Sequence, residues 1–241
     1  MSERKILVIV EGAKTDYKLM KKIFDIYGIS DNHSIISYNT NIYTLYNQLP
    51  ENEEEYADID LLQLLKERET DPKKLELLDE RYTDILMVFD LDPQAPDFLP
   101  EKIRRMANYF TESTNMGKLY LNYPMVESFY HMKRIPDDQY SSYLVSMDTL
   151  KNKEYKQIVH DICRNGDYNK FAVNRDECGY VIKQNLEKAR ILTRTEADIP
   201  DTPSILDHQL ELIKGLKAVS VLCTCVFYIA DYNLKLIDWK S

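Results

Sequence analysis

The sequence predicts an α/β protein in which a parallel sheet flanked by helices is followed by a mainly helical C-terminal region. Two apolar runs, Lys5–Val10 and Ile85–Phe89, are too short for ordinary helices and too apolar to be half exposed. Such runs are typical of buried parallel strands. Acidic residues follow each run, Glu11 after the first and Asp90 and Asp92 after the second. We expect an α/β domain over residues 1–135 and a helical region over residues 136–241.

The opening of the chain predicts a strand–helix–strand unit with a right-handed crossover. A helix over Lys14–Tyr27 follows the first strand, and Gly28 is suited to end it. Ser34–Tyr38 is expected to form the second strand. The helix has apolar residues at the three-and-four spacing of one buried face, namely Tyr17, Met20, Ile23, Phe24 and Tyr27.

The middle of the chain predicts further alternation of helices and strands. An acidic insertion over about residues 50–82 contains two leucine-rich stretches that read as short helices separated at Asp71-Pro72. A helix is expected over Pro100–Glu112, with Pro100 in its first turn, and a short strand over Lys118–Leu121. Beyond about Asp137 the only strand candidates are Phe171–Val173 and an apolar run near the C-terminus.

Composition excludes several classes of protein. The 241 residues are 44% hydrophobic, which is enough for a full core. The four cysteines form no CxxC pair, so we expect no zinc site and a reduced, cytoplasmic location. The chain opens without a signal-peptide pattern. The apolar run Ala218–Ala230 is shorter than a membrane-spanning helix, so we expect it to be buried within the protein rather than in a membrane.

The net charge of −9 is distributed unevenly along the chain. Residues 50–82 hold 12 acidic against 5 basic residues, a balance of −7, whereas residues 151–194 hold 10 basic against 6 acidic residues, a balance of +4. The second segment, with Arg164, Lys170 and Arg175, is a candidate nucleic-acid surface. A solvated helix surface is the alternative interpretation.

The acids at the strand ends predict a cation site. Carboxyl ends of parallel strands meet at one edge of a sheet, so Glu11, Asp90 and Asp92 are expected to converge. Close carboxylates repel one another unless one is protonated or a cation lies between them. Mg²⁺, with Mn²⁺ as a possible substitute, suits carboxylate ligands better than zinc does. Gly12 would let the backbone turn sharply and let a phosphate approach the following helix.

These residues resemble the Toprim domain of topoisomerases, DnaG-type primases, OLD-family nucleases and small ribosomal-RNA maturation nucleases. The shared features are a strand ending in Glu-Gly and a later strand ending in Asp-x-Asp. In more detail, VEGAKTD, with Asp16 five residues after Glu11, and NYPMVESFYH, with Pro124 three residues before Glu127, resemble the RloB-like Toprim proteins associated with phage defence. The resemblance covers about residues 5–131. The chain departs from the maturation nucleases, because PQAPDF follows its Asp-x-Asp where they usually have a glycine-containing turn.

The resemblance implies a Mg²⁺-dependent nuclease acting on DNA or RNA, as an effector of anti-phage defence. It implies that Asp90 and Asp92 hold metal, that Glu11 is a ligand or the acid/base group, and that Glu127 and Asp16 are further candidate ligands. Two of these have a structural alternative: Asp16 suits the first turn of any helix, and Glu127 suits a helix start after Pro124.

Two other functions remain open from the sequence, and a third is disfavoured. The fold could serve as a catalytically silent binding or regulatory module, because fold alone does not fix function. The chain has no GxxxxGK[ST] motif, so an ATPase partner would be a separate polypeptide. An RNA-maturation nuclease is a further alternative, whereas polymerase or topoisomerase chemistry is disfavoured by the size of the chain. A homo-oligomer is also compatible with the sequence.

Overall fold

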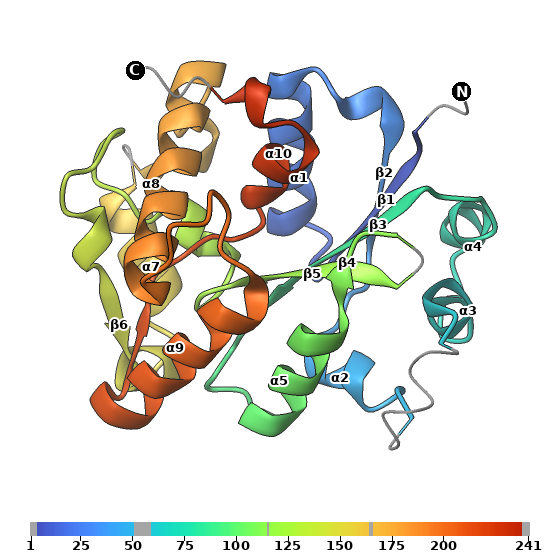
Figure 1. The fold of residues 1–241 in the computed structure, drawn as a ribbon, viewed down its shortest axis with the longest axis horizontal. Coiled ribbons are helices and arrows are strands. Elements are labelled where there is room, and N and C mark those ends of the chain that lie inside the picture. The colour runs from blue at the N-terminus through green and yellow to red at the C-terminus, as the bar shows by residue number, and fades with distance from the viewer. Residues whose placement is uncertain (1–3, 51–58, 115, 164–165, 238–241) are drawn as a thin grey trace. The chain divides into compact units, whose positions relative to one another are not determined.

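The computed structural model describes residues 4–50, 59–114, 116–163 and 166–237 (Figure 1). It divides the chain into two compact units. The first unit contains Met1–Phe89 and Leu99–Tyr120, and the second contains Asp90–Phe98 and Leu121–Ser241. The boundary near residue 135 stays a prediction about domain organisation.

A mainly parallel five-stranded sheet confirms the predicted α/β class. The strand order is β2-β1-β3-β5-β4. Strand β1 pairs in parallel with β2 and with β3, so that Ile6 lies opposite His33 on one side and Asp84 on the other. Strands β4 and β5 pair antiparallel. The strands are β1 (Ile6–Val10), β2 (His33–Ser37), β3 (Asp84–Asp90), β4 (Thr111–Glu112) and β5 (Gly117–Asn122).

Helices cover both faces of this sheet. In Figure 1, α1 lies on one side, and α2 and α5 lie on the other. The two expected short helices of the acidic insertion are present as α3 and α4, while residues 51–58 of the insertion lie outside the described residues. The helices are α1 (Thr15–Tyr27), α2 (Ile42–Tyr46), α3 (Leu61–Lys66), α4 (Pro72–Leu78) and α5 (Pro100–Tyr109), with a 3₁₀ turn, η1 (Ser30–Asn32), after α1.

Two details of the first unit differ from expectation. Tyr17 is exposed rather than buried, because it lies at the margin of the face of α1 that is centred on Met20 and Ile23. Helix α5 ends at Tyr109 instead of Glu112. The reason is Phe110, which leaves helical geometry, is fully buried, and accepts a hydrogen bond from the Leu119 amide (2.8 Å) as the chain enters β4.

The second unit is mainly helical, as expected, around the long helix α8. It also contains a two-stranded antiparallel sheet, β6 with β7, that the sequence did not indicate at β6. Its elements in chain order are η3 (Val126–Tyr130), η4 (Tyr140–Ser142), β6 (Leu144–Ser146), α6 (Met147–Lys151), α7 (Tyr155–Ile162), η6 (Tyr168–Lys170), α8 (Arg175–Thr193), α9 (Thr202–Leu216), β7 (Ala218–Ser220), α10 (Phe227–Tyr232) and η7 (Leu234–Leu236).

The two remaining strand candidates have different outcomes. Phe171–Val173 forms no strand. The apolar run Ala218–Ala230 is buried along its whole length, as predicted, and contributes β7 and most of α10. Within the described part of the chain, every helix is too short or too polar to cross a membrane.

Candidate acidic site

Asp90 and Asp92 lie on a segment that continues strand pairing beyond β3. Asp90, the last residue of β3, is 7% exposed, and its Oδ1 accepts a 3.5 Å hydrogen bond from Nδ2 of Asn122, the last residue of β5. The Leu91 amide donates to the Asn122 carbonyl (3.0 Å), and the Asp92 amide donates to the Pro124 carbonyl (3.1 Å). Backbone hydrogen bonds therefore hold the Asp-x-Asp segment against the chain that follows β5.

Asp92 has a backbone conformation that is unusual for a residue with a side chain. Its φ is +43°, in the left-handed region, which among residues with a side chain is adopted mainly by asparagine, aspartate and histidine. The turn is held by a 2.8 Å hydrogen bond from the Ala95 amide to the Asp92 carbonyl, and Gln94 Nε2 donates to Asp92 Oδ1 (2.9 Å). The fold thus fixes the direction of this carboxylate.

Glu127 is buried in the 3₁₀ segment η3 and is 4% exposed. The segment after Pro124 is a 3₁₀ helix rather than an α-helix, so Glu127 does not lie on an α-helix face. Glu127 Oε1 instead lies 3.0 Å from Nζ of Lys156, in the first turn of α7. Among the described residues, Oε2 of Glu127 has no hydrogen-bond partner. A buried carboxylate oxygen of this kind is suited to accept a cation or a water molecule.

The ammonium of Lys156 contacts Glu127 and lies within electrostatic range of Asp90 and Asp92. Burial lowers the pKa of Lys156, but the charges of Glu127, Asp90 and Asp92 outweigh burial and raise it overall. Burial, and then repulsion from Glu127, raise the pKa of Asp92 against the opposing effects of Gln94 and Lys156. Three carboxylates and one ammonium leave a formal charge of −2, so these four side chains form a site that attracts cations.

The donor set fits a hard divalent cation. Mg²⁺ is usually bound through one or two carboxylates and completes its octahedron with water and substrate phosphate. Within the described ranges, no three acidic, histidine or cysteine side chains are grouped closely enough to hold a metal ion by themselves. Asp90 and Asp92, with Glu127 nearby, match the sparser set of protein ligands that Mg²⁺ accepts, and none of them is a zinc-type ligand.

Glu11 and Asp16 belong to the first unit. Glu11 directly follows β1, and its backbone continues the sheet, because its amide donates to the Val88 carbonyl (3.0 Å) and its carbonyl accepts from the Asn39 amide (2.9 Å). Asp16 is buried in the first turn of α1. A Cβ at Gly12 would lie 2.6 Å from Asp16 Oδ2, so a side chain at position 12 would force this carboxylate to shift. The convergence of Glu11 with Asp90 and Asp92 stays a prediction.

Two of the three predicted nucleic-acid residues, Lys170 and Arg175, are exposed residues of the second unit. Lys170 is paired with Asp167 at 3.5 Å, and Arg175, the first residue of α8, donates to the Leu236 carbonyl at 3.0 Å. Arg164 lies outside the described residues. The role of these three residues in nucleic-acid binding stays a prediction.

Two residues of the acidic site were not singled out from the sequence. Asn122 is fully buried; besides its contact with Asp90, its Oδ1 accepts from the Cys225 amide (3.3 Å). A polar residue ending a buried strand was the available signal for Asn122, the same signal that identified Asp90. Lys156 was only one of ten basic residues in its segment, and no local pattern marks it.

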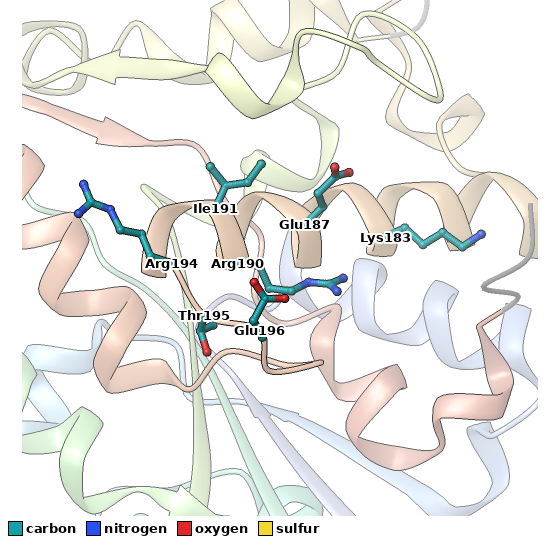
Figure 2. Close-up of a pocket in the computed structure, with 7 residues that line it drawn as sticks. All are labelled: Lys183, Glu187, Arg190, Ile191, Arg194, Thr195 and Glu196. Atoms are coloured by element: carbon teal, nitrogen blue, oxygen red, sulfur yellow. The ribbon is translucent and has the colours of Figure 1, made fainter.

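A second feature is a shallow pocket of about 570 Å³ beside the C-terminal half of α8 (Figure 2). Figure 2 shows Lys183 and Arg194 extending in opposite directions along the helix, with Arg190 and Glu196 between them. Because its charges do not converge on one point, this pocket lacks the electrostatic focus of the acidic site. It is lined by Lys183, Glu187, Arg190, Ile191, Arg194, Thr195 and Glu196.

Comparison of the chain with protein-family models, with curated proteins and with solved structures found no match.

Proposed function

We propose that this chain is a Mg²⁺-dependent nuclease that hydrolyses phosphodiester bonds of DNA or RNA. The observation that carries the proposal is the buried carboxylate of Glu127, which contacts Lys156 at 3.0 Å, while the charges of Asp90 and Asp92 act on the same ammonium. The Toprim-like strand ends, Glu-Gly and Asp-x-Asp, support the same function.

In this proposal some residues of the chain would bind the cation and others would bind the substrate. Asp90 and Asp92 would hold Mg²⁺, with Glu127 available to a second ion and Glu11 as a further ligand or acid/base group. Bound Mg²⁺ supplies charge stabilisation at the phosphate and lowers the pKa of attacking water. Lys156, whose side chain is two-thirds exposed, can leave Glu127 and donate to a phosphate oxygen.

The wider role rests on the resemblance to RloB-like and OLD-family proteins. We propose a cytoplasmic effector of anti-phage defence with a Toprim arrangement of the sheet, working with a separate ATPase. An RNA-maturation nuclease would use the same acidic site, and cleavage of DNA in the assay below would argue against that alternative.

The second candidate is a catalytically silent Toprim module. One observation favours it: Lys156 already neutralises Glu127 at 3.0 Å, so the site has an internal cation. In that case the ion pair is structural, and neither metal nor nucleic acid is turned over.

A cleavage assay separates the two candidates. The purified chain is incubated with plasmid, single-stranded DNA and tRNA, each with Mg²⁺, with Mn²⁺ and with EDTA. We expect metal-dependent cleavage that Asp90→Asn abolishes, because this change keeps the volume and removes the charge. Asp97→Asn, at an exposed acid in the same loop, is the matched control and should cleave as the wild type does. Equal cleavage by Asp90→Asn would assign activity to another site or protein.

A further inference from the structure

A stacked pair of tyrosines lies next to the acidic site. The rings of Tyr130 and Tyr168 are 4.1 Å apart with an interplanar angle of 8°. Tyr130 is buried at the end of η3, three residues after Glu127, and Tyr168 begins η6. The charge of Glu127 contributes, after burial, to raising the pKa of Tyr168, so this hydroxyl lies within electrostatic reach of the acidic site.

The geometry of this pair differs from that of its neighbours. Phe129 and Phe171 both contact Tyr130 edge to face, and they also contact each other edge to face, the arrangement common in packed cores. Among the ring pairs of the described residues in this cluster, only Tyr168 stacks face to face on Tyr130. Tyr168 is also only half-buried, so the stack ends at an aromatic ring that is partly open to solvent.

Two lysines and a histidine lie near Tyr168, and each is close to an acidic side chain. Lys156 and His160 are four residues apart on α7 and therefore lie on one side of it. The His160 ring is 6.2 Å from that of Tyr168, and His160 also lies 3.7 Å from Asp161. Lys170, beyond Tyr168 in η6, is largely exposed and contacts Asp167. An aromatic face with basic side chains beside it is the arrangement by which proteins bind unpaired nucleotides.

We infer that Tyr168, supported from beneath by Tyr130, is a stacking platform for an unpaired base of the nucleic acid whose phosphate reaches the acidic site. The inference rests on the proposed function, because that function places a phosphate of the substrate at the acidic site. It narrows the substrate class to single strands, strand ends or flipped nucleotides, because a base inside a duplex is already stacked on its neighbours. Either DNA or RNA can supply such a base, since every base has a π-face.

Binding measurements test the platform without requiring turnover. Fluorescein-labelled single-stranded DNA, single-stranded RNA and duplex DNA are titrated with the full chain in EDTA, and with Asp90→Asn in Mg²⁺. We expect Tyr168→Leu to weaken binding of the single strands roughly tenfold, the typical loss for one stacked base, and to leave duplex binding unchanged. Tyr168→Phe keeps the ring and should bind as the wild type does.

A spectroscopic variant provides a direct readout of stacking. Tyr168→Trp adds one indole to a chain whose only tryptophan is Trp239, and stacking of a base on that indole should quench its emission during titration with an oligonucleotide. Tyr180 supplies the matched control, because it is a half-buried tyrosine of α8 with Lys183 Nζ 5.3 Å from its ring. Tyr180→Trp should show no comparable quenching, and Tyr180→Leu no loss of affinity.

The outcomes distinguish this inference from the nuclease proposal. Loss of single-strand affinity in Tyr168→Leu, with quenching in Tyr168→Trp, supports the platform even if no cleavage is found. Wild-type affinity in Tyr168→Leu and unquenched emission in Tyr168→Trp overturn it, even if cleavage depends on Asp90. A change of oligomeric state in Tyr168→Leu, without a change in nucleic-acid affinity, overturns it in favour of a protein contact.

Discussion

Lys188 makes the stability of this protein depend on pH in a predictable way. It lies in α8 with 2% of its surface exposed, and its Nζ donates to the carbonyls of Tyr140 (2.9 Å) and Tyr143 (2.8 Å). A neutral amine has two N–H donors, which these two carbonyls satisfy, whereas the ammonium form has a third. Burial lowers the pKa of Lys188 to about 7.

The magnitude follows from the two pKa values of Lys188. In the unfolded chain this lysine has a pKa of 10.5, so between about pH 7 and pH 10 the unfolded chain binds a proton that the folded chain lacks. The free energy of unfolding therefore rises with pH in this window. The contribution of Lys188 to it decreases as the pH falls and is lost below about pH 7. The difference between pH 7 and pH 9 is about 2 kcal/mol.

Urea unfolding at pH 7, 8 and 9 measures this contribution. Lys188→Met removes the titrating group, so its free energy of unfolding should rise with pH by about 2 kcal/mol less than that of the wild type. Lys183→Met is the control, because Lys183 lies on the same helix with its side chain in the surface pocket (Figure 2). Leaving two carbonyls without a donor lowers the whole curve of Lys188→Met, so the readout is its slope. Parallel curves for the wild type and Lys188→Met would refute the reasoning.

Two further changes have defined expectations. Asp84→Asn should destabilise the fold by roughly 1–3 kcal/mol at pH 7, because it removes a carboxylate that accepts hydrogen bonds from Arg4 (2.9 Å) and Ser113 (2.6 Å). Burial raises the pKa of Asp84, but these hydrogen bonds outweigh burial and lower the pKa overall. This stabilisation is lost as the pH falls through the lowered pKa, so wild type and variant should converge in acid unfolding, and a constant gap would contradict the assignment. Lys156→Met should lower the stability of the metal-free protein by about 1 kcal/mol and tighten Mg²⁺ binding roughly three- to tenfold. Calorimetry measures the Mg²⁺ affinity, and equal affinities of the wild type and Lys156→Met would contradict this expectation.

The sheet and its acidic strand ends were predictable because their signals are local. The strands β1 and β3 are continuous apolar runs, and in parallel neighbours both runs end at one edge. The same reasoning identified Asp90 and Asp92 directly. It also identified the breaks around Pro72 and Pro100, since proline restricts the backbone wherever it occurs.

The parts that were missed depend on contacts between distant residues. Strand β6 has one buried residue, Val145, and exists because Ala218–Ser220 pairs with it from far along the chain. Glu127 and Lys156 meet because η3 and α7 pack together. The helix start that Pro124 suggested belongs to a 3₁₀ segment, because a proline at a helix start does not distinguish a 3₁₀ helix from an α-helix. Residue spacing carries no information about such tertiary contacts.

Binding of Mg²⁺ to the purified chain tests the central claim most directly, because a trace of contaminating nuclease can mimic cleavage but cannot mimic a bound ion. Isothermal titration calorimetry of the wild type, Asp90→Asn and Asp97→Asn isolates the acidic site, and Glu11→Gln shows whether Glu11 contributes to it. We predict saturable Mg²⁺ binding to the wild type and Asp97→Asn that is lost in Asp90→Asn. Identical isotherms for all three proteins, or no binding to any of them, would contradict the assignment of a metal site at Asp90 and Asp92.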